Sequence, residues 1–135
     1  MRRRELLGGF GVLATAAMLL TAHGSTAEAA DPPVLVLVTY HSATGNTEKM
    51  AQGVAEGAKA VSGTTVVLKR VGDVTSNDLV SSDAVIVGSP VYFANMSGEV
   101  KTFFDNWSLK FDLFRDRKMR DKVGAAFANL REQFA

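Results

Sequence analysis

The stretch VLVLVTYHSATGNTEKMA, residues 34–51, decides the fold of this chain. It opens with a run of β-branched and leucine side chains, residues 34–39, which predicts a strand buried on both faces. A polar turn from His41 to Thr47 follows directly, and apolar residues then recur at helical spacing over 47–61. A buried strand that leads through a short polar turn into an amphipathic helix indicates an α/β protein.

The same alternation continues along the chain. Further strands are predicted over 64–69, 84–88 and 123–128, and helices over 76–81 and 98–107. Strands that alternate with helices are joined by right-handed crossovers, so they form a parallel sheet. The sequence therefore predicts the α/β class with four parallel strands.

Composition limits what the protein can be. With 135 residues, 47% hydrophobic and 21% charged, the chain forms at most one ordinary globular domain. It contains no cysteine, which excludes disulfides, thiolate nucleophiles and thiolate metal sites. The two histidines, His23 and His41, are too few and too far apart in sequence to indicate a metal site.

Residues 1–29 are predicted to be an export signal. They have a basic start, a weakly apolar stretch over 6–22 and a small-residue end, Ala27-Glu28-Ala29, that fits signal peptidase. The Arg3-Arg4 pair is similar to a twin-arginine signal, which exports folded proteins. General secretion and an uncleaved signal that anchors the protein in the membrane are the alternatives. We expect a periplasmic or extracellular protein with a linker at 30–33 and its domain at 34–135.

Net charge argues against bulk electrostatic binding. Residues 1–29 carry three Arg and two Glu, so the remaining chain has 12 Lys+Arg and 12 Asp+Glu and a net charge of zero. The overall charge of this remaining chain therefore gives no support for electrostatic attraction to nucleic acid or to a membrane. A protein-binding role for Arg115, Arg117, Lys118 and Arg120 is an alternative, but three interleaved aspartates favour a solvated connection.

The turn after the first strand has the chemistry of a phosphate loop. Gly45 can adopt positive φ, and the helix that follows directs its first amides into the turn. Hydroxyl and amide donors come from Ser42, Thr44, Asn46 and Thr47. The loop contains no Lys or Arg, and neither G-x-x-x-x-G-K-[ST] nor G-x-G-x-x-G occurs, so one monophosphate fits better than a triphosphate. A simple helix N-cap is the alternative.

The turn after the third strand, GSPVYFANMSGE at 88–99, is aromatic. Tyr92, Phe93 and Met96 are large side chains at a strand end, and Asn95 can hydrogen-bond the edge of a flat heterocycle. Packing of Tyr92 and Phe93 beneath the next helix is the alternative. A phosphate loop at one end and an aromatic loop at the other together indicate FMN.

Two motifs carry a family resemblance. SATGNT, residues 42–47, resembles the phosphate loop of flavodoxins. GSPVYFANMSGEVKTFFDNW, residues 88–107, is similar to the signature of WrbA-like NAD(P)H:quinone oxidoreductases. The resemblance extends over about 34–128 and implies a flavodoxin-like three-layer sandwich with strand order 2-1-3-4-5 and non-covalent FMN.

The resemblance also implies site residues. Those expected to hold the FMN phosphate are Ser42, Thr44, Gly45, Asn46 and Thr47, and those expected to border the isoalloxazine ring are Pro90, Val91, Tyr92, Phe93, Ala94 and Asn95. The implied activity is two-electron reduction of a quinone by NAD(P)H. Because the flavin performs that chemistry, no side chain is assigned as acid or base, and His41 is expected to have a surface or packing role.

The chain departs from the family after the fourth strand. LREQFA, residues 130–135, does not resemble the Gly- and Ser/Thr-rich sequence that follows in WrbA-like enzymes. We expect a chain truncated at that point, with one wall of the ring site missing, strand 123–128 as an exposed edge and FMN bound weakly or not at all. The alternatives are a remnant without FMN binding and a flavodoxin-type electron carrier, although such carriers are strongly acidic. WrbA-like enzymes often form tetramers, which makes a homo-oligomer a further expectation.

Overall fold

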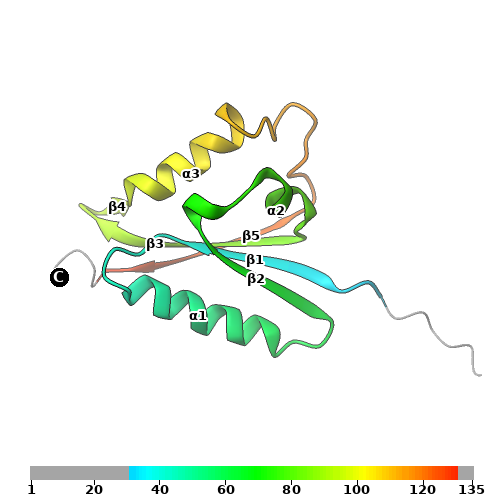
Figure 1. Cartoon of the computed structure of the whole chain (residues 1–135), viewed down its shortest axis with the longest axis horizontal. Helices are drawn as coiled ribbons and strands as arrows, with labels where there is room; N and C mark the ends of the chain where they lie inside the picture. The colour runs from blue at the N-terminus through cyan, green and yellow to red at the C-terminus, as the bar shows by residue number, and fades with distance from the viewer. Residues whose placement is uncertain (1–30, 131–135) are drawn as a thin grey trace, which may run out of the picture.

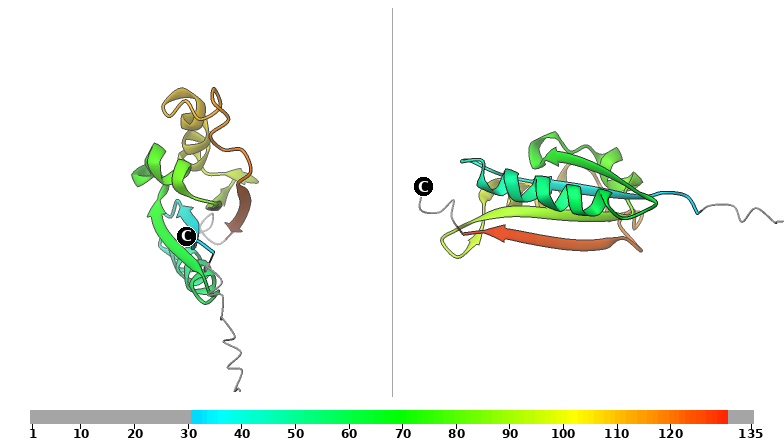
Figure 2. Two further views of the ribbon diagram at one scale, coloured as in Figure 1. Left: turned by 90° about the vertical axis from the view of Figure 1, so that its right-hand side faces the viewer. Right: turned by 90° about the horizontal axis from the view of Figure 1, so that it is seen from below.

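A computed structural model describes residues 31–130 as three layers, with a parallel sheet between helices (Figure 1). The elements in chain order are β1 (Val34–Tyr40), α1 (Asn46–Lys59), β2 (Thr64–Arg70), the 3₁₀ turn η1 (Val71–Asp73), α2 (Ser76–Ser81), β3 (Ala84–Tyr92), β4 (Asn95–Met96), α3 (Gly98–Leu109) and β5 (Val123–Asn129). Helix α1 covers one face of the sheet, and α2 and α3 cover the other (Figures 1 and 2).

Four strands form the parallel sheet, in the order β2-β1-β3-β5. This arrangement confirms the predicted α/β class and follows the family order as far as its fourth parallel strand. The short β4 pairs antiparallel with the end of β3, and no sequence pattern predicted it.

Alternate residues of β1 supply the two cores that hold the layers together. Val36 and Val38 pack with Ala51 and Ala55 of α1, whose small side chains let the helix approach the sheet closely. Leu37 points to the opposite face. Burial on both faces explains why β1 reads as a continuous apolar run.

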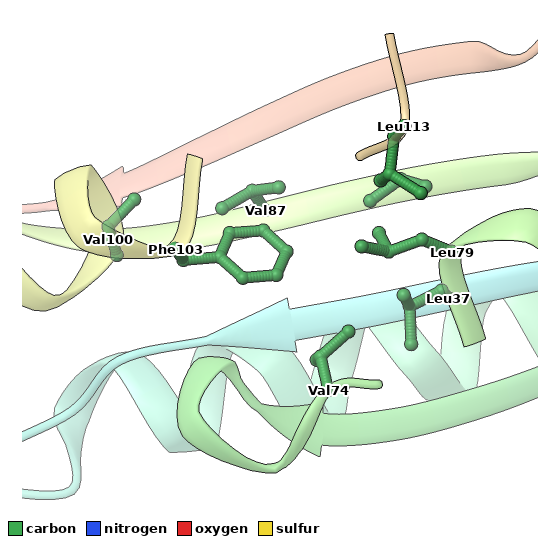
Figure 3. Packing of buried hydrophobic residues seen from close by; sticks show 8 residues of the cluster. Leu37, Val74, Leu79, Val87, Val100, Phe103 and Leu113 are labelled. Carbon is green, nitrogen blue, oxygen red and sulfur yellow. The ribbon is translucent and has the colours of Figure 1, made fainter. Parts of the chain in front are cut away.

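The second core lies between the sheet and helices α2 and α3. Its buried residues are Leu37, Val74, Leu79, Val85, Val87, Val100, Phe103 and Leu113. Figure 3 shows these side chains converging from both strands and helices, with Leu113 reaching in from the connection between α3 and β5. Leu113 therefore fixes that connection to the body of the protein.

Helix α2 has the bounds that its sequence predicts because it carries its own start signal. The Thr75 hydroxyl accepts a hydrogen bond from the Asp78 amide, and the Asp78 carboxylate accepts one from the Thr75 amide. Such a capping box satisfies two amides that would otherwise lack helical partners. Lys69 of β2 also donates to both Asp78 carboxylate oxygens at 2.8 Å, which ties α2 to the sheet.

The structure corrects the predicted end of the third strand. β3 continues four residues beyond Gly88 to Tyr92, so much of the segment expected to be a loop is strand. The extension is stabilised by pairing with β4 and by a hydrogen bond from the Ser97 amide to Ser89 Oγ. Helix α3 likewise runs to Leu109, two residues past its predicted end.

Strand β5 is an edge strand of the sheet formed by residues 31–130, as expected. It pairs with β3 alone, and most of its residues are exposed, including Val123 and Gly124. The predicted signal and the LREQFA segment, apart from Leu130, lie outside the described residues. Among residues 31–130, no helix combines the length and apolar character that crossing a membrane requires.

Candidate functional site

The two predicted loops leave neighbouring strands at the carboxyl edge of the sheet. Tyr40 at the end of β1 is in register with Gly88 of β3, and the His41 amide donates to the Gly88 carbonyl at 3.1 Å. The predicted loops over 41–47 and 88–99 therefore start from adjacent positions of the sheet, and the hairpin turn follows at the end of β3, after Tyr92. Ligands of open parallel sheets bind at this edge.

The loop at 42–47 has the backbone form that its sequence predicts. Gly45 adopts φ 88° and is the N-cap of α1. Its amide donates to Ser42 Oγ at 3.0 Å, and the Asn46 side-chain amide donates to Thr44 Oγ1 at 3.1 Å. The turn is thus closed by its own polar groups, while Thr44 remains exposed at the start of the helix. This arrangement offers helix-terminal amides and a hydroxyl to an anion.

A cation that sequence reasoning did not assign lies against this loop. Arg70, the last residue of β2, donates to the Ser42 carbonyl at 3.1 Å and to Glu48 at 2.7 Å. No motif places Arg70 there, but β1 and β2 are in register, which pairs Tyr40 with Arg70 across the sheet. Pairing of β1 with β2 in this register is what places Arg70 at the loop, and local sequence pattern does not give it.

Tyr40 joins the same polar cluster. Its hydroxyl donates to Glu48 at 2.8 Å, and the Arg70 guanidinium lies 5.5 Å from the centre of its ring. Burial raises the pKa of the Tyr40 hydroxyl above 10.0, and Glu48 raises it further, against a smaller opposing effect of Arg70. Tyr40 is therefore a neutral donor at physiological pH, and its hydrogen bond helps to hold the Glu48 carboxylate in place.

The segment after β3 is a tight hairpin and not the open loop that the sequence predicted. Val91 pairs with Met96 and Tyr92 with Asn95, which leaves Phe93 and Ala94 as the two turn residues. Their φ angles are 49° and 62°, the two positive values of a type I′ turn. This turn type favours Asn and Gly, so an aromatic residue and an alanine there are under backbone strain.

The predicted ring-bordering residues divide by exposure. Pro90 is buried, Val91 and Tyr92 are half-buried, and Ala94 and Asn95 are exposed. Phe93 is 93% exposed, which excludes the alternative that it packs beneath α3. The hairpin thus presents an aromatic side chain to solvent at the edge where a planar ligand would lie.

Two hollows lie at this end of the protein. The smaller, about 260 Å³, is lined mainly by apolar side chains of β3, α3 and β5. The larger, about 670 Å³, lies between the end of β2 and α3, and His41, Arg70, Asp73, Thr102 and Asn106 are among the residues that line it. Neither includes the exposed side of the phosphate loop.

His41 connects the loop to α3. Its Nε2 lies 3.5 Å from Glu99 Oε2 in the first turn of that helix. The expected surface or packing role fits this position, because the contact joins the start of the loop to the helix. Among residues 31–130, no group of three or more His, Asp or Glu side chains could hold a metal ion.

Comparison with known proteins identifies the family. Residues 37–111 match the family model described as a flavodoxin domain. More than half of the chain lies within that match, so the protein belongs to the flavodoxin domain family. A flavodoxin of Aquifex aeolicus (strain VF5) is 48% identical over 71 residues, which are 53% of this chain and 38% of that protein.

Solved structures agree. A WrbA-like flavodoxin from Agrobacterium tumefaciens superposes with a TM-score of 0.60 and 32% identity, over 71% of this chain and 59% of that one. The two-electron reduced flavodoxin of Megasphaera elsdenii gives 0.52 and 25%, over 70% of this chain and 85% of that one. This chain therefore spans less than two thirds of two of these three relatives.

Flavodoxin-family homologues bind FMN, and the described residues fit its phosphate end. The evidence is the Gly45 turn at positive φ, the adjacent helix terminus and the exposed Thr44 hydroxyl. For the ring end, the described chain provides the strained, exposed hairpin as one wall. Residues beyond Leu130 lie outside the described range.

Proposed function

We propose that this protein binds FMN at the carboxyl edge of its sheet and uses it for electron transfer. The observation that carries the proposal is that the Gly45 turn and the Phe93 hairpin follow neighbouring strands at the same edge of the sheet. A loop of amides and hydroxyls beside an exposed aromatic matches the two ends of FMN.

The residues divide the binding task between them. Ser42, Thr44, Asn46 and Thr47, with the first amides of α1, would hold the phosphate. Arg70 supplies positive charge next to the loop, and its ion pair with Glu48 fixes the guanidinium in place. The hairpin from Pro90 to Asn95 would border the ring, and Phe93 would shield it from water. Bound FMN supplies reversible two-electron chemistry, and the protein supplies position and electrostatics.

We propose two-electron reduction of a quinone by NAD(P)H as the reaction. Its support is the similarity of residues 88–107 to the WrbA-like signature and the likeness to a WrbA-like structure at 32% identity. Residues 31–130 carry 11 Lys+Arg and 11 Asp+Glu, whereas flavodoxin carriers are strongly acidic. A neutral domain is the better match to the oxidoreductase.

An electron carrier without NAD(P)H activity is the second candidate. The 48% identity to an Aquifex aeolicus flavodoxin favours it. We also propose that residues 1–29 export the protein. NAD(P)H is scarce outside the cytoplasm, so export favours this carrier, with another reductant as its electron donor. A homo-oligomer in the manner of WrbA-like enzymes belongs to the same proposal.

An FMN titration of the full chain tests the proposal. Saturable quenching of flavin fluorescence, with a folded far-UV circular dichroism spectrum, is the expected result. A folded chain without quenching would overturn FMN binding and leave a remnant of the fold. If FMN binds, NAD(P)H oxidation that depends on added quinone supports the oxidoreductase. Reduction by dithionite and reoxidation by quinone, without NAD(P)H turnover, support the carrier instead.

A further inference from the structure

Charge is unevenly distributed over the domain. The connection between α3 and β5, residues 110–122, is here named the basic loop, and it carries six Lys+Arg and three Asp, a net charge of +3. The other residues of the described range carry five Lys+Arg and eight Asp+Glu, a net charge of −3. The net charge of zero is therefore the sum of a positive segment and an otherwise acidic domain.

The basic loop has a defined shape. Leu113 is fully buried in the core, and its amide donates to the Trp107 carbonyl at 2.8 Å. The Lys118 amide donates in turn to the Leu113 carbonyl at 3.0 Å. Asp112, Arg117 and Asp121 all adopt positive φ, an unusual conformation that these contacts maintain. A segment held in this way presents its side chains in a fixed arrangement.

Large apolar side chains are exposed among the charges. Phe114 follows the buried Leu113 and is 58% exposed, and Leu109 at the end of α3 is 84% exposed. The aspartates lie 3.4–3.9 Å from Arg115, Lys118 and Arg120, all at the surface, so they weaken the positive field only in part. Exposed Phe and Leu next to Lys and Arg are typical of surfaces that bind the interface of an anionic bilayer.

The basic loop lies at the amino end of the sheet, as does the start of β1 (Figure 1). Asp83 connects the two: its carboxylate accepts from the Leu35 amide at 2.7 Å, and its carbonyl accepts from the Val123 amide at 3.0 Å. Lys122 also donates to the Val80 carbonyl at 2.8 Å at this end. The start of β1 and the end of the basic loop are thus connected through Asp83 at this end of the sheet.

We propose that the basic loop, together with Leu109 and Phe114, docks the protein on an anionic phospholipid bilayer. Cations attract the lipid headgroups, and the two apolar side chains enter the boundary between headgroups and acyl chains. The carboxyl edge of the sheet, at the opposite end of the parallel strands, then faces away from the lipid. The proposal does not depend on FMN binding.

Vesicle partitioning of the full chain tests the proposal. Vesicles of phosphatidylcholine with phosphatidylglycerol are compared with vesicles of phosphatidylcholine alone, at low and high salt. The test variant is Arg117→Gln/Lys118→Gln, and the control Lys59→Gln/Lys101→Gln removes the same charge from exposed positions on α1 and α3. Residues 1–30 are present in every variant, so their contribution to binding cancels in the comparison.

The test variant should lose about tenfold in partitioning on anionic vesicles, and less at high salt, while the control loses under twofold. Leu109→Ser/Phe114→Ser should also weaken binding, whereas Val61→Ser at another exposed site should not. Circular dichroism establishes that each variant is folded. Equal losses in test and control variants, or no loss in either, would overturn the proposal. Loss of binding to soluble polyglutamate with unchanged vesicle binding would also overturn it, in favour of an acidic protein partner.

Discussion

The ring of Phe127 in β5 lies directly over Gly88, its register partner in β3. A Cβ built on Gly88 would be 2.2 Å from Phe127 Cζ and 2.5 Å from Cε2, far inside van der Waals contact. Gly88 also accepts the hydrogen bond from His41 that joins the two loops of the candidate site. The absence of a side chain at Gly88 therefore lets the edge strand pack against the sheet where the site begins.

Gly88→Ala should destabilise the fold by about 1–3 kcal/mol, because the Phe127 ring must leave its position to admit the methyl group. Urea unfolding measures the loss. Gly53→Ala is the matched control, since nothing lies within 4 Å of a Cβ at that helical position. It should stabilise α1 by about 0.5–1 kcal/mol. Equal effects of the two substitutions would contradict the packing argument.

Arg70→Ala should weaken FMN binding by about three- to tenfold, since it leaves the negative charge of Glu48 beside the phosphate loop without its ion-pair partner. The effect should be larger at low salt. Fluorescence titration gives the Kd. Adding Glu48→Gln to Arg70→Ala should restore most of the affinity, because the uncompensated negative charge is then gone.

Lys69→Ala is the control for Arg70→Ala. Lys69 is the preceding residue of β2, but it pairs with Asp78 and not with the loop. Its loss should lower the unfolding free energy and leave the Kd for FMN within twofold. A similar loss of FMN affinity in both variants would indicate a general effect of strand charge and would argue against a local role for Arg70.

Asp78 should make stability depend on pH at the acid end. Burial opposes ionisation, but hydrogen bonds from Lys69 and from Thr75 outweigh it and lower the pKa of Asp78 below 3.8. A carboxyl whose pKa is lower in the folded state stabilises the fold above its unfolded pKa. That stabilisation is lost as pH falls through the folded value.

Asp78→Asn should therefore cost about 1 kcal/mol at neutral pH, the typical value of a lost cap. Urea unfolding at neutral pH and below pH 3.8 gives the comparison. The difference between wild type and variant should shrink at the acid end. A constant difference across this range would show that ionisation of Asp78 contributes nothing.

Local sequence predicted β1 well because this strand is buried. β1 is covered on both faces, so its apolar run is continuous, and its predicted start at Val34 is confirmed. The predicted end of β3 at Gly88 was wrong because the strand is longer than its apolar run. Ser89-Pro90 ends the apolar run at Gly88, whereas the strand is prolonged by pairing with β4, an interaction that local pattern does not encode.

The candidate site likewise contains features that local sequence predicts and features that it does not. The Gly45 turn is local, so its sequence was enough to predict its positive φ. Arg70 reaches the loop from 28 residues away in sequence, through strand register alone. The hairpin turn was missed because Phe93-Ala94 lacks the Asn or Gly that normally signals positive φ. Strain at a site for a flat ligand is informative in itself, since such residues cluster where function requires them.

Phe93→Gly tests whether that strain serves binding. Glycine adopts φ near 49° without the steric cost of a side chain, so the variant should be about 1 kcal/mol more stable to urea. It should bind FMN several-fold more weakly, because the exposed ring that would cover the flavin is gone. Ala94→Gly removes strain from the same turn and keeps Phe93, so it should gain similar stability with a smaller loss of affinity. A destabilised Phe93→Gly, or equal losses of affinity in the two variants, would assign Phe93 to the fold and not to the ligand.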